Sequence, residues 1–126
     1  MRIFHGLFDA AFHFPSHQLP EVFCGFGRED FEVPVSYPVA CHPQAWASGA
    51  LPYLVATLLG LEPDGFGKRL RIVRPLLPRG IDHLNVRRLR VGQASVDLTF
   101  HRRGVGVDAD VMHVEGELTV EVEKAA

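Results

Sequence analysis

Apolar residues recur with two different periods along the chain, and the period changes near residue 65. Residues 2–14 carry an apolar stripe at helical spacing, formed by Ile3, Phe4, Leu7, Phe8, Ala11 and Phe12. Pro15 closes this predicted helix, because the residue before a proline avoids the helical region. Residues 43–61 are apolar nearly all round, which predicts a second, buried helix that Pro52 kinks or splits in two and Gly60 ends.

The segment between these helices, residues 15–42, holds four prolines and two glycines. This composition predicts a long ordered loop with short extended pieces. Loops of this length are uncommon in compact domains, and those that occur are often functional.

From residue 69 onward the apolar positions recur every second residue, which predicts strands. The alternation slips at Arg87–Arg88, as a β-bulge would cause. Turns are expected at Gly92-Gln93, Arg103-Gly104 and Glu115-Gly116. We predict an antiparallel sheet over 69–123 with one buried face. The side chains expected inside are Val96, Leu98, Phe100, Val107, Leu118, Val120 and Val122.

Together these patterns predict an α+β chain with a helical domain over 1–65 and an antiparallel β-domain over 66–126. The two helices carry more apolar surface than one small sheet covers. We therefore expect the helical domain to pack against further protein, by self-association as an oligomer or by docking on a larger subunit.

Composition narrows the class of protein. The 126 residues carry a net charge of −2, so nothing global attracts nucleic acid or an anionic membrane. The arginines of the strand region are balanced by acids and are expected on a solvent face, with no nucleic-acid partner. The uncharged run Pro43–Leu61 contains Gln44, Ser48 and Thr57, so a buried helix is favoured over a membrane span. Two distant cysteines and the absence of a signal-peptide pattern predict a cytoplasmic protein.

Four residues are candidates for chemistry in the loop and at the start of the second helix. Glu21 lies among aromatic residues and is either a general base or a solvated loop carboxylate. Gln44, Trp46 and Tyr37 suit a sugar, through ring stacking and hydrogen bonds to hydroxyls. The alternative places Trp46 in the core and leaves Gln44 to support the helix start.

Neither a metal nor a cofactor is expected. His13 and His17 are four residues apart, but Pro15 between them breaks the helix that would align them. Cys24 and Cys41 show no close pairing, and the phosphate-binding and dinucleotide-binding glycine motifs are absent from the sequence.

Three strings resemble a known family: LPEVFCGF (19–26), VSYPVACHPQAW (35–46) and LLGLEPD (58–64). They are similar to the C-terminal catalytic region of bacterial amylo-α-1,6-glucosidase-like proteins and, more distantly, to the glucosidase half of eukaryotic glycogen-debranching enzymes. The resemblance implies that residues 1–65 are the last helices of an (α/α)6 barrel of six hairpins, followed by the β-domain. It also implies an α-glucan or oligosaccharide substrate, Glu21 as the general base of an inverting hydrolysis, and Gln44 and Trp46 close to it.

The family's general acid is an aspartate upstream of the LPE loop, and this chain starts one helix before that loop. Inverting hydrolysis needs two opposed carboxyl groups. We therefore expect a fragment of a debranching-type hydrolase that is inactive alone. Two alternatives remain: a carbohydrate-binding module that uses the Trp46 region, or a subunit that completes a barrel supplied by another chain.

Overall fold

The computed structural model describes residues 2–41 and 44–123, and its contacts divide the chain into two compact units, Met1–Val55 and Ala56–Ala126. The sequence pattern placed the change near residue 65, about ten residues later. None of the described helices is long and apolar enough to cross a bilayer.

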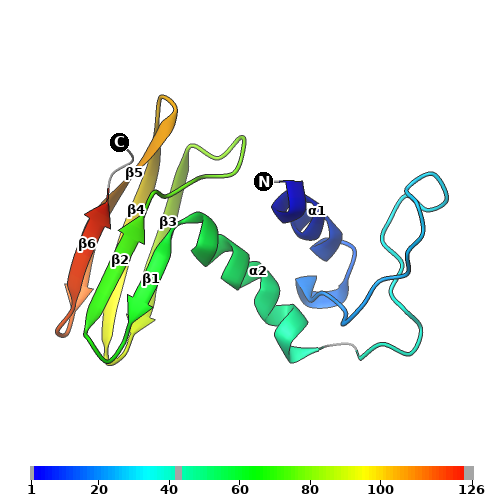
Figure 1. The fold of residues 1–126 in the computed structure, drawn as a ribbon, viewed down its shortest axis with the longest axis horizontal. Coiled ribbons are helices and arrows are strands. Elements are labelled where there is room, and N and C mark those ends of the chain that lie inside the picture. Colours follow the sequence, from blue (N-terminus) through cyan, green and yellow to red (C-terminus); the bar gives the residue numbers. More distant parts are fainter. Residues whose placement is uncertain (1, 42–43, 124–126) are drawn as a thin grey trace. The chain divides into compact units, whose positions relative to one another are not determined.

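The first unit contains two helices, a short helical turn and a long loop (Figure 1). The helix α1 (Arg2–Ala11) is followed by a 3-10 turn, Pro15–His17, and the helix α2 (Ala45–Leu58) begins after the loop. The buried cluster of this unit is small and is formed by Ala10, Ala11, Leu19 and Ala47. The bulkier side chains packed around it, such as Phe14 and Phe23, are only partly buried.

The exit from α2 depends on Gly60. The helix runs as one element through Pro52 and ends at Leu58. Gly60 then adopts a φ of +64°, and its carbonyl accepts a hydrogen bond of 2.9 Å from the Val73 N–H. A Cβ at this position would collide with the Val73 carbonyl, so only glycine fits both the angle and the space. The predicted helix terminator is therefore confirmed.

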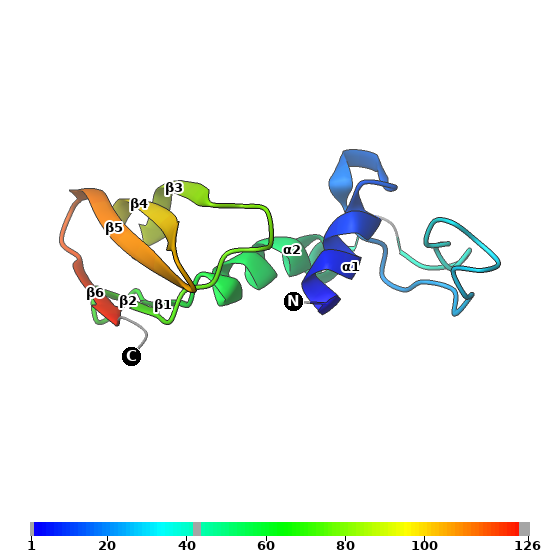
Figure 2. The same ribbon diagram turned by 90° about the horizontal axis from the view of Figure 1, so that it is seen from above.

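The second unit is built from two three-stranded sheets that lie as separate layers (Figure 2). One sheet has the order β1-β2-β6 and contains β1 (Leu61–Asp64), β2 (Arg69–Val73) and β6 (Thr119–Glu123). The other is the antiparallel meander β3 (His83–Val91), β4 (Ala94–Arg103) and β5 (Gly106–Glu115). Strands β1 and β2 are antiparallel, whereas β2 and β6 are parallel.

Both sheets contribute to one apolar core. Leu70 and Ile72 of β2 are fully buried, and so are Val96, Leu98 and Phe100 of β4. These positions are two residues apart on their strands, so they share one face of each sheet. The buried positions predicted for β4 are confirmed. The remaining residues expected inside are half-buried: Val107, Leu118, Val120 and Val122.

The predicted bulge in β3 is also confirmed. The pairing with β4 passes from Val86 opposite Leu98 to Leu89 opposite Val96, so two residues of β3 face one residue of β4. Arg88 adopts a φ of 52°, and its main-chain N–H donates a hydrogen bond of 2.6 Å to the Asp97 carboxylate. The side chain of Asp97 thereby satisfies a donor that the irregular strand leaves without a ladder partner.

The predicted fold class is wrong. The described part of the chain has two short α-helices and six strands, so it is mainly β and contains no helices of an (α/α)6 barrel. An apolar helical stripe shows that a face can be buried, but not that a ring of helices covers it. The single antiparallel sheet is wrong as well, because residues 61–64 form a strand and β6 pairs in parallel with β2.

Phe100→Ala is expected to lower the free energy of unfolding by about 3–5 kcal/mol, because the ring is fully buried and its loss leaves a cavity. Val105→Ala is the control, since Val105 lies fully exposed in the turn after β4 and should change stability by less than about 0.5 kcal/mol. Chemical denaturation measures both. Equal losses in the two variants would contradict the assignment of this core.

Candidate functional site

The loop of the first unit folds back on itself as an irregular antiparallel stem. Phe23 and Ser36 form an isolated β-bridge. The Cys24 N–H donates a hydrogen bond of 2.8 Å to the Val35 carbonyl, and the Tyr37 N–H donates one of 3.2 Å to the Val22 carbonyl. Main-chain hydrogen bonds therefore hold the two sides of the loop together, and residues 25–34 form its tip.

Glu21 lies at the base of this stem, where it meets Cys41. The Cys41 N–H donates a hydrogen bond of 3.2 Å to Glu21 Oε2, and the Glu21 N–H donates one of 3.3 Å to the Cys41 carbonyl. Main chain and side chain of Glu21 are thus both tied to the same residue. Glu21 is half-buried, and the hydrogen bond from Cys41 favours one orientation of its carboxylate.

The LPE segment and the start of α2 meet in the small apolar cluster. Leu19 is 3% exposed and belongs to the same cluster as Ala47, which follows Trp46 in the helix. Pro20 is fully buried next to Leu19 and stiffens the segment that carries Glu21. The cluster therefore holds the loop carboxylate near the helix start, although the two are more than twenty residues apart in sequence.

The other predicted residues lie in the same region. Trp46 is 63% exposed, so the alternative that placed it in the core is not what the structure shows. The Gln44 carbonyl accepts a hydrogen bond of 2.9 Å from the Ser48 N–H at the start of the helix. Three residues of chain span at most about 11 Å, so Gln44 lies within that distance of Cys41. Tyr37 is half exposed on the stem.

The loop and the start of α2 thus carry two exposed aromatic rings, an amide and a hydrogen-bonded carboxylate. Such a set suits a ligand that is rich in hydroxyl groups. It does not by itself supply two-carboxylate hydrolysis, which needs a second carboxyl group about 6.5–9.5 Å away in an inverting enzyme. The hydrogen bonds of Glu21 in the described part of the chain connect it to Cys41 and to no second carboxyl group.

A second polar surface lies on the meander sheet, where the sequence predicted only a charged, solvent-exposed face. A hollow of about 610 Å³ lies over β3, β4 and β5. His83 Nδ1 lies 3.2 Å from His101 Nδ1, and His101 Nε2 lies 2.7 Å from Asp110 Oδ2. The Thr99 hydroxyl donates a hydrogen bond of 2.8 Å to Asn85 Oδ1. These side chains largely satisfy one another, which leaves few free groups for a ligand.

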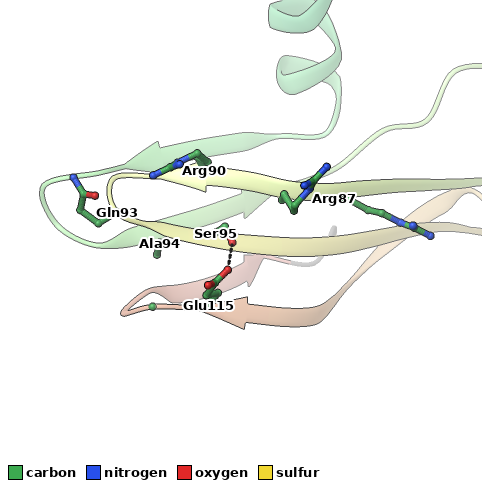
Figure 3. Close-up of a pocket in the computed structure, with 8 residues that line it drawn as sticks. Arg87, Arg90, Gln93, Ala94, Ser95 and Glu115 are labelled. Carbon is green, nitrogen blue, oxygen red and sulfur yellow. Dashed lines mark hydrogen bonds between the residues drawn. The ribbon is translucent and has the colours of Figure 1, made fainter.

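An adjacent hollow of about 730 Å³ lies where β3 turns into β4 (Figure 3). Its polar lining is formed by Arg87, Arg88, Arg90, Gln93, Ser95 and Glu115. The predicted bulge was the sequence feature from which this hollow could have been predicted. However, the sequence did not show which residues of β4 and β5 would lie beside the bulge.

No group of three or more histidine, cysteine, aspartate or glutamate residues in the described part of the chain is arranged to hold a metal ion. Cys24 and Cys41 are both free thiols. Comparison with protein-family models, curated proteins and solved structures finds no match to the chain. The resemblance of the LPE and QAW strings to the debranching enzymes therefore stays a prediction, and function is argued from these two surfaces.

Proposed function

We propose that this chain is the α-glucan-binding part of a debranching-type glycoside hydrolase and does not hydrolyse glucan on its own. One observation carries the proposal: Leu19 of the segment that carries Glu21 and Ala47 at the start of α2 belong to one buried cluster, and Trp46 beside Ala47 is exposed. The resemblance of both segments to the amylo-α-1,6-glucosidase-like proteins points to the same ligand class.

The exposed indole is the main binding element in this proposal. Exposure of an aromatic ring of this size to water is unfavourable. A flat sugar ring can cover the indole while the hydroxyl groups of the sugar remain hydrogen-bonded. The amide of Gln44 and the phenol of Tyr37 can both donate and accept hydrogen bonds at the edge of that platform. Glu21 then accepts a hydrogen bond from a glucan hydroxyl or, in a complete active site, from the attacking water.

Under this proposal the general acid comes from a larger catalytic subunit. The resemblance assigns Glu21 the role of the base, the Cys41 N–H binds its carboxylate, and an opposed acid is needed to complete the reaction. The protein acts in the cytoplasm, where glucan stores are degraded. Its two free thiols, of which Cys41 is exposed and Cys24 half-buried, fit a reducing compartment, where cysteines stay unpaired.

Trp46→Ala is expected to weaken the binding of branched malto-oligosaccharides at least about tenfold, since stacking and burial of one ring contribute roughly 1.5 kcal/mol or more. Isothermal titration calorimetry measures the affinity. Phe66→Ala is the matched control, because Phe66 is also a fully exposed aromatic residue but lies in the second unit. Equal weakening by the two substitutions, or no binding by the unaltered chain, would refute the glucan site.

The purified chain is expected to release no glucose from α-1,6- or α-1,4-linked glucans, because only one carboxylate of the proposed pair is present. Reducing-sugar release over many hours measures this. Glu32→Gln serves as the control, since Glu32 is an exposed carboxylate of the same loop. Sustained turnover that Glu21→Gln abolishes and Glu32→Gln leaves intact would show that the chain is a complete enzyme.

The exposed face of α1 favours a second role as a subunit. The rings of Phe4, Phe8 and Phe12 form a row with centroids 5.5 Å and 5.3 Å apart; Phe4 is buried, whereas Phe8 and Phe12 are 40% and 62% exposed. Ile3 beside them is 74% exposed. Contiguous apolar surface of this kind is typical of protein interfaces. We propose that this face docks on the larger subunit or, in its absence, on a second copy of the chain.

Phe12→Glu is therefore expected to shift the chain toward the monomer, because it places a charge in the proposed interface. Light scattering over a dilution series measures the average mass. Phe66→Glu adds the same charge at an exposed aromatic residue outside that face and should leave the mass unchanged. An unaltered chain that stays monomeric at high concentration would contradict self-association through α1.

A further inference from the structure

The hollow at the β3–β4 turn has a lining of mixed charge. Figure 3 shows Arg87 and Arg90 on β3, Gln93 in the turn, Ser95 on β4 and Glu115 at the end of β5. The hollow measures about 730 Å³, which is within the range of small-molecule sites. Three segments of the meander contribute to it, so its shape depends on the pairing of all three strands.

The bulge is what gathers the arginines. In a regular strand, Arg87 and Arg88 would point to opposite faces of the sheet. Because both face Asp97 of β4 across the bulge, both line the hollow together with Arg90. The Asp97 carboxylate is engaged by the Arg88 main-chain N–H at 2.6 Å.

These three arginines, like Arg79, lie outside the ion pairs of the described residues, whereas several other arginines of the second unit are paired with carboxylates. Arg71 lies 2.8 Å from Glu62, and Arg102 lies 3.0 Å from Asp82. Like charges that line one hollow repel one another, and a bound anion lowers that repulsion. The planar fork of arginine matches the oxygens of a phosphate group.

The opposite side of the hollow is suited to hydroxyl groups. The Ser95 hydroxyl lies 3.4 Å from Glu115 Oε2, and the amide of Gln93 lies in the same lining. A carboxylate repels a bare phosphate ion, but it accepts hydrogen bonds from hydroxyl groups. The ligand that matches both sides therefore carries a phosphate at one end and hydroxyl groups at the other.

We propose that this hollow binds the phosphate monoester of a polyhydroxy compound, with the phosphate on the arginines and the sugar hydroxyls on Ser95 and Glu115. The ester is carried by a small sugar phosphate or by a phosphorylated glucan chain. The proposal goes beyond glucan binding at Trp46 and uses residues of the other unit. Each site is therefore tested without the other.

Glucose 6-phosphate, glucose and inorganic phosphate are the probes, titrated into the full chain and followed by calorimetry. Glucose 6-phosphate is expected to bind more tightly than inorganic phosphate, and glucose to give no signal. Arg90→Gln should weaken glucose 6-phosphate about tenfold, which corresponds to about 1.4 kcal/mol. Arg79→Gln is the control: Arg79 is exposed, lies outside the hollow, and takes part in none of the described ion pairs. Equal weakening by the two substitutions would overturn the proposal.

Glu115→Gln separates a polyol phosphate from a simple anion. Removing the carboxylate lowers repulsion, so inorganic phosphate should bind more tightly, whereas glucose 6-phosphate should gain less or lose affinity because a hydroxyl acceptor is weakened. Circular dichroism checks that each variant is folded. Equal affinity of the unaltered chain for glucose 6-phosphate and inorganic phosphate would also overturn the proposal, because no hydroxyl would then be recognised.

Retention of the protein on a phosphorylated α-glucan, measured before and after phosphatase treatment of the glucan, distinguishes the two sources of the phosphate ester. Phosphate-dependent retention that Arg90→Gln reduces and Arg79→Gln does not assigns the hollow to the polymer. Binding of glucose 6-phosphate without such retention assigns it to a small sugar phosphate. Trp46→Ala should leave the binding of glucose 6-phosphate intact, so failure of the glucan site and failure of this one are distinguishable.

Discussion

A three-stranded sheet has two faces, and in a chain of this size neither sheet of the second unit can bury one of them alone. The shared apolar layer of Leu70 and Ile72 with Val96, Leu98 and Phe100 is therefore the interaction on which the rest of that unit depends. It places every second residue of β4 inside, and a slip by one residue would bring all of them to the surface. The outward residues of β4 and the bulge opposite Asp97 take their positions from this layer.

The first unit is held together differently. Its buried cluster consists mostly of small residues, so hydrogen bonds along the loop stem do much of the positioning. Leu19 and Ala47 join the loop to α2, and the Glu21–Cys41 pair closes the stem. Local order of this type opens more readily than a large core, and ligand-binding loops are commonly found in such regions. A ligand or a partner that binds this unit would therefore also stabilise its fold.

Local features of the fold could be predicted from the sequence, whereas long-range pairings could not. Strict alternation identified the buried face of β4, the slipped phase identified the bulge at Arg87–Arg88, and Gly60 marked the end of α2. Alternation specifies a face but not a partner, so the parallel pairing of β6 with β2 was missed. The LPE and QAW residues were singled out, but the contact between Glu21 and Cys41 depends on how the loop folds back. The arginine hollow could not be predicted, because its lining depends on the strand register, which sequence patterns do not supply.

The parallel pair has a consequence for synthesis on the ribosome. Strand β2 emerges from the ribosome well before the strand that covers its second edge, β6, because the whole meander lies between them in sequence. During the whole interval β2 has a hydrogen-bonded neighbour only on the β1 side, and its other edge presents unpaired main-chain groups. A strand edge of this kind pairs readily with the same edge of another nascent chain. Protection of the open β2 edge until β6 has formed is therefore expected to favour correct folding over pairing between chains.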